Sequence, residues 1–311
     1  MNPPLIYVWI GYELPNWAID SLRISHQSCG LETILLTNSS VKKCKFVSKH
    51  IYIEDFYNEI LSTDKKFKLI NKFRDGFWVR TLERFLVLRC FVIDKNINNF
   101  FHAELDNIVF NISDLSKKLD HCGKGFFCPR DSFDRGIASL VYINEQSSLD
   151  SFSDICLDKV GGHFNDMTFL GSKLKISDNF FSLPTENIYG SEDDEIWNFI
   201  DPVIIGGIFD AASLGQYIFG IDKKNSFFPA FNGFVNENSG KYLKDLNFYI
   251  NLSGKYCEIK IPHVRERVNL YNLHVHSKIF NLINDNDKLT ALLDKINKGK
   301  KILIKRSFGY D

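Results

Sequence analysis

Residues 6–37 read IYVWIGYELPNWAIDSLRISHQSCGLETILLT, and this stretch decides the fold class. The apolar run Ile6–Ile10 predicts a buried strand. The segment 14–30, with a proline and an asparagine near its start, predicts a helix, and 33–37 predicts a second buried strand. A strand, a helix and a strand in this order form a βαβ unit. We therefore expect an α/β protein with a Rossmann-like, mostly parallel central sheet flanked by helices.

The pattern continues along the chain, most clearly in a long helix. Residues 77–93 place apolar side chains at helical spacing, with charged side chains largely between them. Residues 99–106 predict a strand that runs into a turn, and 107–111 a second extended segment. Weaker patterns predict a strand and linking helix over 41–60, extended segments at 137–143, 202–207 and 271–279, and helices that begin at Asn165 and cover 209–217 and 287–296. No internal repeat or linker divides the sequence, so we expect a single domain over 1–311.

The charge balance limits the class of partner. Lys plus Arg and Asp plus Glu number 38 each, so the formal net charge is zero. Nucleic-acid binders normally carry a basic surplus that meets the phosphates. We therefore expect no nucleic-acid partner. We interpret the basic run from Lys298 to Arg306 as a solvated tail, with a local basic patch as the alternative.

Cysteine usage and hydropathy indicate a compartment. The seven cysteines are scattered and form no CxxC pair, which is typical of reduced thiols in a cytoplasmic protein. The first residues lack the basic region and cleavage site of a signal peptide. No stretch approaches the roughly 18 apolar residues of a spanning helix. We expect a cytoplasmic protein without a transmembrane segment, and peripheral membrane contact stays open.

The pattern His102-x-Glu104-x-Asp106 is the first candidate for chemistry. On an extended strand, alternate residues project from the same face. Ligand sites of open α/β sheets lie at the carboxyl ends of strands, and carboxylates are the ligands that hard divalent cations prefer. The pattern predicts a metal site. A half-exposed edge strand with a solvated polar face is the alternative.

A second pattern, His274-x-His276-x-Lys278, lies far downstream. Alone, a His-x-His pair is a weak metal signal. Combined with the earlier carboxylates it would suit Mn²⁺ or Mg²⁺ bound to a diphosphate, with the lysine as a compact charge on the phosphates.

The order of these segments resembles glycosyltransferases of the GT-A fold. The resemblance rests on the helix GFWVRTLERFLVL (76–88), the strand and turn NNFFHAELDNIVF (98–110) and the late NLHVHSK (272–278). In that family a DxD-type motif ends a strand and holds a metal with the diphosphate of a nucleotide sugar, and a His near the C-terminus often completes the metal shell. This chain departs from DxD by having Glu104 first.

The resemblance implies a set of site residues. The metal, Mn²⁺ or Mg²⁺, would be bound by Glu104, Asp106 and His276, while His102 would be structural. The residues implied for the nucleotide-sugar donor are Val8, Trp9, Ile10, Gly11, Arg80, Thr81, Arg84, Glu104, Leu105 and Lys278. For the arginines among them, a solvated outer helix face is the alternative.

The resemblance also suggests the reaction and the division of the chain. Asp166 or Asp210 would deprotonate an acceptor hydroxyl of a glycan or glycoconjugate if the enzyme inverts, and for both the alternative is a helix cap. Residues 1–112 would form a nucleotide-binding half, 113–285 an acceptor-binding half, and 286–311 a terminal helix and tail. Bacterial-type surface polysaccharide assembly would follow by analogy.

Two other functions remain open from the sequence. A metal-dependent phosphate-ester hydrolase would use the same carboxylates and histidines. A non-catalytic carbohydrate-binding module would use aromatic side chains, which make up 14% of the residues. Most of those aromatics are Phe, which sits in cores, and only 4 are Trp.

Overall fold

The computed structural model describes residues 2–57, 76–153, 155, 164–189, 199–222, 234–235, 247–251, 256–260, 267–283, 285–298 and 304–305. The helices are α1 (Asn16–Ser28), α3 (Phe77–Asp94), α4 (Leu115–Asp120), α5 (Asp150–Ser153), α6 (Asp166–Ile176), α7 (Pro202–Ile205), α8 (Ser213–Phe219) and α9 (Asn286–Lys298). The strands are β1 (Leu5–Trp9), β2 (Thr33–Thr37), β3 (Lys49–Tyr52), β4 (Phe100–Ala103), β5 (Asn107–Val109), β6 (Phe126–Ser132), β7 (Arg135–Gly136), β8 (Leu140–Ile143), β9 (Phe180–Leu183), β10 (Gly207–Ile208), β11 (Phe234–Val235), β12 (Asn247–Asn251), β13 (Tyr256–Lys260), β14 (Arg267–Leu270), β15 (Asn272–His274) and β16 (Ile304–Lys305).

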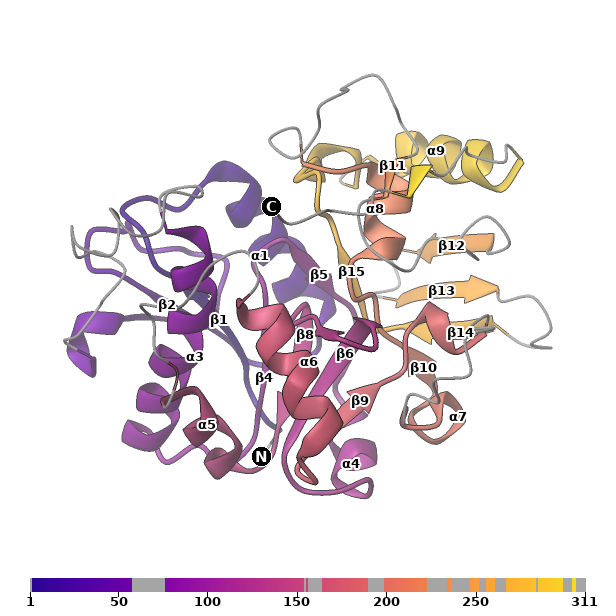
Figure 1. Cartoon of the computed structure of the whole chain (residues 1–311). Coiled ribbons are helices and arrows are strands. Elements are labelled where there is room, and N and C mark those ends of the chain that lie inside the picture. The colour runs from indigo at the N-terminus through magenta and orange to yellow at the C-terminus, as the bar shows by residue number, and fades with distance from the viewer. Residues whose placement is uncertain are drawn as a thin grey trace.

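A mixed central sheet organises the molecule (Figure 1). Its strands follow the order β3-β2-β1-β4-β8-β6-β7, and β9 also pairs with β6. The pairs β3–β2, β2–β1, β1–β4 and β6–β9 are parallel, and β8 runs antiparallel to both β4 and β6. This confirms the expected α/β class. It also means that β4, β6 and β9 all direct their carboxyl ends to one edge of the sheet.

Apolar alternation along β1 divides the core into two layers. Ile6 and Val8 lie in one core cluster with side chains of α3 and α6. Leu5 and Tyr7 lie in the other cluster, with side chains of α1 and α4. Because successive strand residues point to opposite faces, an uninterrupted apolar strand indicates helices on both sides. The structure has that arrangement.

A smaller sheet lies beside the central one, where Figure 1 shows β12, β13 and β14 next to α8 and α9. Its order is β10-β14-β13-β12. A third core cluster joins it to α8 and α9 through residues such as Leu214, Ile259 and Leu293. The two-stranded pair β5–β15 is antiparallel and sets His274 opposite Asn107. Residues far apart in the sequence meet there, next to the turn after β4.

Several local expectations need correction. Residues 202–205 form helix α7 rather than an extended segment. Asp201 accepts the N–H of Val203 at 2.8 Å, the proline occupies the first helical turn, and Gly206 ends the helix at φ 82°. The late strand covers only 272–274 and then turns, and the strand expected at 137–143 begins at Leu140. Part of the helix expected within 41–60 lies outside the described residues.

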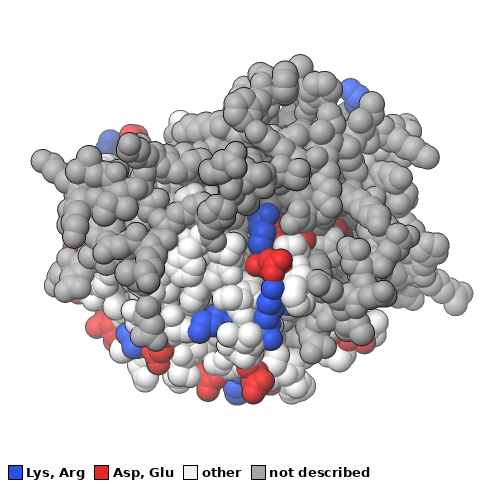
Figure 2. Space-filling view, viewed as in Figure 1, with Lys and Arg blue, Asp and Glu red and all other residues white. Residues whose placement is uncertain are grey.

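Among the described residues on the face shown in Figure 2, acidic and basic atoms lie next to one another near the centre. In the described part of the chain no helix is long and apolar enough to cross a membrane.

Candidate metal centre

The turn between β4 and β5 carries the two carboxylates that the sequence singled out. β4 ends at Ala103. The N–H of Glu104 is bonded to the carbonyl of Ser139 at 3.2 Å, and the N–H of Asn107 to the carbonyl of Glu104 at 3.0 Å. The turn, rather than strand alternation, therefore directs Glu104 and Asp106, which corrects the expected geometry.

The side chain of His102 points into the core and away from these two carboxylates. Its ring is buried against Phe85, and its Nδ1 lies 2.9 Å from the carbonyl of Ile6. Burial, followed by the charge of Arg84, lowers the pKa of His102 to about 3. The geometry is that of a neutral core histidine, in line with the structural role expected for it.

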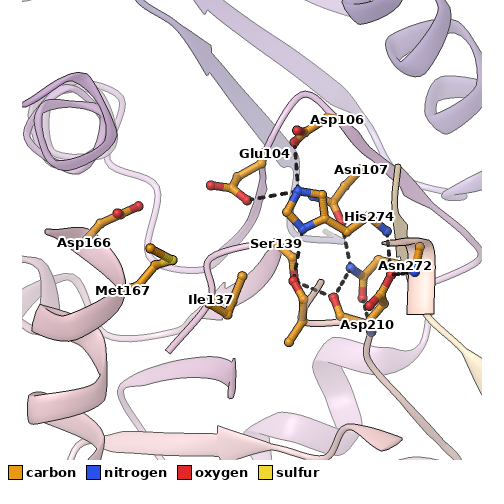
Figure 3. Close-up of polar contacts among 12 residues, drawn as sticks. Glu104, Asp106, Asn107, Ile137, Ser139, Asp166, Met167, Asp210, Asn272 and His274 are labelled. Atoms are coloured by element: carbon orange, nitrogen blue, oxygen red, sulfur yellow. Dashed lines mark hydrogen bonds and ion pairs between the residues drawn. The ribbon is translucent and has the colours of Figure 1, made fainter. Parts of the chain in front are cut away.

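Glu104, Asp106 and His274 form a group able to hold a metal ion. Their ligand atoms lie within 4.8 Å of one another. His274 Nε2 is 3.3 Å from Asp106 Oδ1 and 3.8 Å from Glu104 Oε2, and Figure 3 shows the imidazole directed at both carboxylates. Two carboxylates and one imidazole nitrogen suit a divalent cation that keeps other positions for substrate oxygens.

The ring of His274 is held in one orientation. Its Nδ1 lies 3.0 Å from the carbonyl of Ala211, so Nδ1 donates and Nε2 faces the carboxylates. Such a bond to the second ring nitrogen is the usual support of a metal-bound histidine. Burial disfavours the imidazolium, but the charge and hydrogen bond of Asp106 outweigh it and raise the pKa of His274 to about 10. In the same way His274 and Lys278 overcome burial and hold the pKa of Asp106 far below its usual range.

His276, the histidine expected as a ligand, lies in the turn after β15. Its Nδ1 accepts the N–H of Asp222 at 3.0 Å. The structure thus brings His274 to the carboxylates at the place expected for His276, and a ligand role for His276 stays a prediction. Lys278 Nζ lies 3.6 Å from Asp106 Oδ2 and 3.3 Å from Asp222 Oδ2, and its contact with donor phosphates stays a prediction.

Arg84 joins two acidic groups. Its guanidinium is 2.7 Å from Glu104 Oε1 through one nitrogen and 2.7 Å from Asp166 Oδ2 through the other. The arginine is buried, so the solvated alternative does not apply to it. Its donor-binding role stays a prediction. The geometry shows an arginine that orients Glu104.

The two candidate bases occupy different surroundings. Asp166 begins α6, is buried beside Arg84, and has its pKa raised by burial. Asn165, not Asp166, caps that helix, by accepting the N–H of Thr168 at 3.1 Å. Asp210 lies beneath His274, where burial raises its pKa to about 6 and both carboxylate oxygens accept backbone N–H groups.

The remaining donor residues lie at the ends of β1 and in α3. Val8 and Ile10 are buried in the core beneath α3. Trp9 Nε1 donates to the carbonyl of Glu13 at 2.9 Å, and the N–H of Gly11 donates to Asn38 Oδ1 at 2.9 Å.

Arg80 is partly buried, and Thr81 donates to the carbonyl of Trp78 at 2.9 Å. Leu105 is packed in the core cluster that contains α1. Leu105 lies in the same turn as Glu104 and Asp106, whereas the other donor residues named here lie on other segments. Their contacts with a nucleotide stay predictions.

Sequence reasoning did not assign His274 to the metal. The His-x-His pattern offered two candidates, and only the register of β5 with β15 selects between them. Asn107 and Asn272, buried beneath the group, were also not singled out. Neither carries a sequence signal apart from its position beside a candidate ligand.

No family model matches the sequence, and no curated protein matches it. Among solved structures, the chain is similar to apo mouse xyloside xylosyltransferase 1, at 11% identity and a TM-score of 0.38, over 60% of this chain and 86% of that one. It is similar to the galactosyltransferase LgtC bound to donor and acceptor sugar analogs, at 10% identity and 0.33, over 65% and 85%. It is also similar to a cytidylyltransferase from Leptospira borgpetersenii, at 13% identity and 0.34, over 62% and 77%. Since every TM-score is below 0.5, these likenesses carry no weight for the function of this chain.

Proposed function

We propose that the protein is a metal-dependent glycosyltransferase that moves a sugar from a nucleoside-diphosphate sugar to a hydroxyl of a glycan or glycoconjugate. The observation that carries this proposal is the cluster of Glu104, Asp106 and His274 with Lys278 beside it. Three ligands around one ion leave room for the oxygens of a diphosphate. A lysine at 3.6 Å from one ligand adds a second positive charge at the same place.

The parts of the site divide the chemistry between them. Bound Mn²⁺ or Mg²⁺ would supply positive charge that stabilises the departing diphosphate. Lys278 contacts the phosphates as a point charge. Arg84 keeps Glu104 turned toward the ion and holds Asp166 near the sugar. Asp166 is the proposed base of an inverting reaction, since its buried carboxylate has a raised pKa.

The location and the residues further from the metal belong to the same proposal. We place the reaction in the cytoplasm, where nucleotide sugars are available, and by analogy in polysaccharide assembly. The end of β1, with Trp9 and Gly11, would hold the base and ribose. The halves 1–112 and 113–285 would bind donor and acceptor.

A thermal-shift experiment tests the function. Purified protein is heated with UDP, GDP or no nucleotide, each in Mn²⁺ or in excess chelator. We expect one diphosphate to raise Tm in Mn²⁺ and not in chelator, because the ion bridges the carboxylates and the phosphates. Asp106→Asn should abolish the shift. Asp114→Asn, an exposed carboxylate paired with Lys117, is the matched control and should keep it.

Other outcomes favour the other functions. No response to any nucleotide, in Mn²⁺ or in chelator, would contradict the glycosyltransferase. Mn²⁺-dependent release of phosphate from a simple phosphate ester, without a nucleotide response, would favour the hydrolase. Stabilisation by free oligosaccharides alone would favour a carbohydrate-binding module.

A further inference from the structure

Asp210 makes an unusual set of contacts for a carboxylate with no exposed surface. Its Oδ1 accepts the N–H of Leu214 at 3.0 Å. Its Oδ2 accepts the N–H of Gly215 at 2.9 Å and the N–H of His274 at 2.8 Å. One side chain therefore joins the start of α8 to the backbone of a metal-binding residue.

Only an ionised carboxylate satisfies these three donors. An asparagine at this position would present one acceptor oxygen and one NH₂ group, and the NH₂ would face a backbone N–H that also donates. Burying the charge is costly. The three hydrogen bonds and the nearby imidazole of His274 offset only part of that cost, since burial still raises the pKa of Asp210.

The backbone of Asp210 is fixed as firmly as its side chain. The amide of Asn272 accepts from the N–H of Asp210 at 3.1 Å and donates to its carbonyl at 2.9 Å. Ser139 Oγ donates to the same carbonyl at 2.7 Å. The second hydrogen of the Asn272 amide reaches Asn107 Oδ1 at 2.8 Å. Figure 3 shows the side chains of Ser139, Asn272 and Asp210 gathered below the imidazole.

The same network reaches the carboxylate side of the metal group. The carbonyl of Ser139 is bonded to the N–H of Glu104, while its hydroxyl is bonded to Asp210. Gly215 allows α8 to approach this closely, because a Cβ there would lie 1.8 Å from the carbonyl oxygen of His274. Buried polar contacts therefore hold together the three segments that meet at the site: the turn after β4, residues 210–215 and β15.

Asp210 lies at both points that hold His274. It binds the N–H of His274 directly, and it immediately precedes Ala211, whose carbonyl accepts from Nδ1. We propose that Asp210, fixed by Asn272, is the positioning residue that presents Nε2 of His274 to a divalent cation held with Asp106. The proposal rests on the metal site of the proposed function. It gives Asp210 a role that differs from the base expected from the sequence.

A double-mutant cycle on metal affinity tests the proposal. Binding of Mn²⁺ alone is measured by EPR of the free ion and by calorimetry for the wild type, Asp210→Asn, His274→Ala and the double variant. We expect Asp210→Asn to weaken Mn²⁺ about 10- to 100-fold, the usual effect of losing support for a metal-bound histidine. In the His274→Ala background the same substitution should change affinity less than about twofold, because a residue that acts through His274 has nothing left to position.

Controls separate this effect from general damage. Asp201→Asn removes a carboxylate that also accepts a backbone N–H at a helix start, and it should leave Mn²⁺ affinity unchanged. Circular dichroism shows which variants fold. If Asp210→Asn does not fold, Asn272→Ala replaces it in the same cycle, since it removes the support of Asp210 and keeps the carboxylate.

The outcomes distinguish the two proposals. Equal losses with and without His274, or no loss with Asp210→Asn, would overturn the positioning role while Asp106→Asn and His274→Ala still weaken Mn²⁺. If Asp106→Asn leaves Mn²⁺ affinity intact, the metal site itself is wrong and the proposed function fails with it.

Discussion

At the scale of single residues, Arg84 carries more of the site than its place in a long helix suggests. Its side chain is 10% exposed, and its partners Glu104 and Asp166 are 20% and 4% exposed. Burial disfavours its charge, but the two carboxylates outweigh it and raise the pKa of Arg84. A guanidinium suits this place because its flat fork can bind two carboxylates in fixed directions.

Replacing Arg84 by Met should destabilise the fold by about 3 to 5 kcal/mol, because the buried Asp166 and the partly buried Glu104 would lose their counter-charge. Urea unfolding measures the change. Arg89→Met is the matched control: this arginine pairs with Asp150, which is 57% exposed, and its loss should cost about 1 kcal/mol or less. Similar losses for the two variants would contradict the structural role given to Arg84.

Local residue patterns singled out the carboxylates of the candidate site and not the histidine that lies beside them. Glu104 and Asp106 follow an apolar strand, and that signal lies within a few residues of sequence. The choice of His274 over His276 depends on pairing with Asn107, and the contacts of Asp210 depend on α8 lying against β15. Neither relation has a local pattern, so a single sequence could not supply it.

At the scale of elements, a glycine in α6 allows this helix to pack closely against the hairpin formed by β6 and β7. Gly171 lies within α6, and a Cβ there would be 1.9 Å from the carbonyl oxygen of Asp134, between β6 and β7. A glycine inside a helix normally costs about 1 kcal/mol relative to alanine. Here the close approach of the hairpin outweighs propensity.

Gly171→Ala should therefore destabilise the protein by roughly 1 to 3 kcal/mol, as overpacking does, instead of stabilising it. Thermal unfolding followed by circular dichroism gives the sign. The neighbouring Ser172 is exposed, so Ser172→Ala should change stability by no more than about 0.5 kcal/mol. A stabilised Gly171→Ala variant would show that the hairpin does not press on this helix.

Elements were predicted best where apolar runs are long. The strands at 5–9 and 33–37 and the helix Phe77–Asp94 follow from their patterns. Helix α7 was predicted as extended because four apolar residues carry no period, and its helical form depends on the cap by Asp201. In the second sheet, β10 has two residues and pairs with β14 far along the chain, so it leaves little local signal.

At the scale of the whole molecule, the metal group joins the central sheet to the chain's last third. Glu104 and Asp106 follow a strand of that sheet, and His274 ends β15. An ion that binds all three would bridge parts that also meet through the β5–β15 pair and the contacts of Asp210. Binding to the folded state alone stabilises it in proportion to occupancy.

Mn²⁺ at 100 times its Kd should therefore raise the free energy of unfolding by about 2.7 kcal/mol. Calorimetry with and without Mn²⁺ gives the change in Tm, and chelator should reverse it. Asp106→Asn should show no gain, while Asp114→Asn should behave as the wild type. A wild-type Tm that does not respond to saturating Mn²⁺ would argue against an ion that bridges these segments.

The pairing of β15 with β5 also indicates when the site forms during folding. Asn107 and Asn272 are separated by 165 positions along the chain, and contacts over such separations form only after much chain entropy has been lost. The ligands from the two segments meet when that closure is complete, so an ion cannot guide the early steps of folding. The ion acts on unfolding instead. It must dissociate, or β5 and β15 must separate around it, before the native state is lost. The ion would lengthen the lifetime of the finished fold rather than speed its formation.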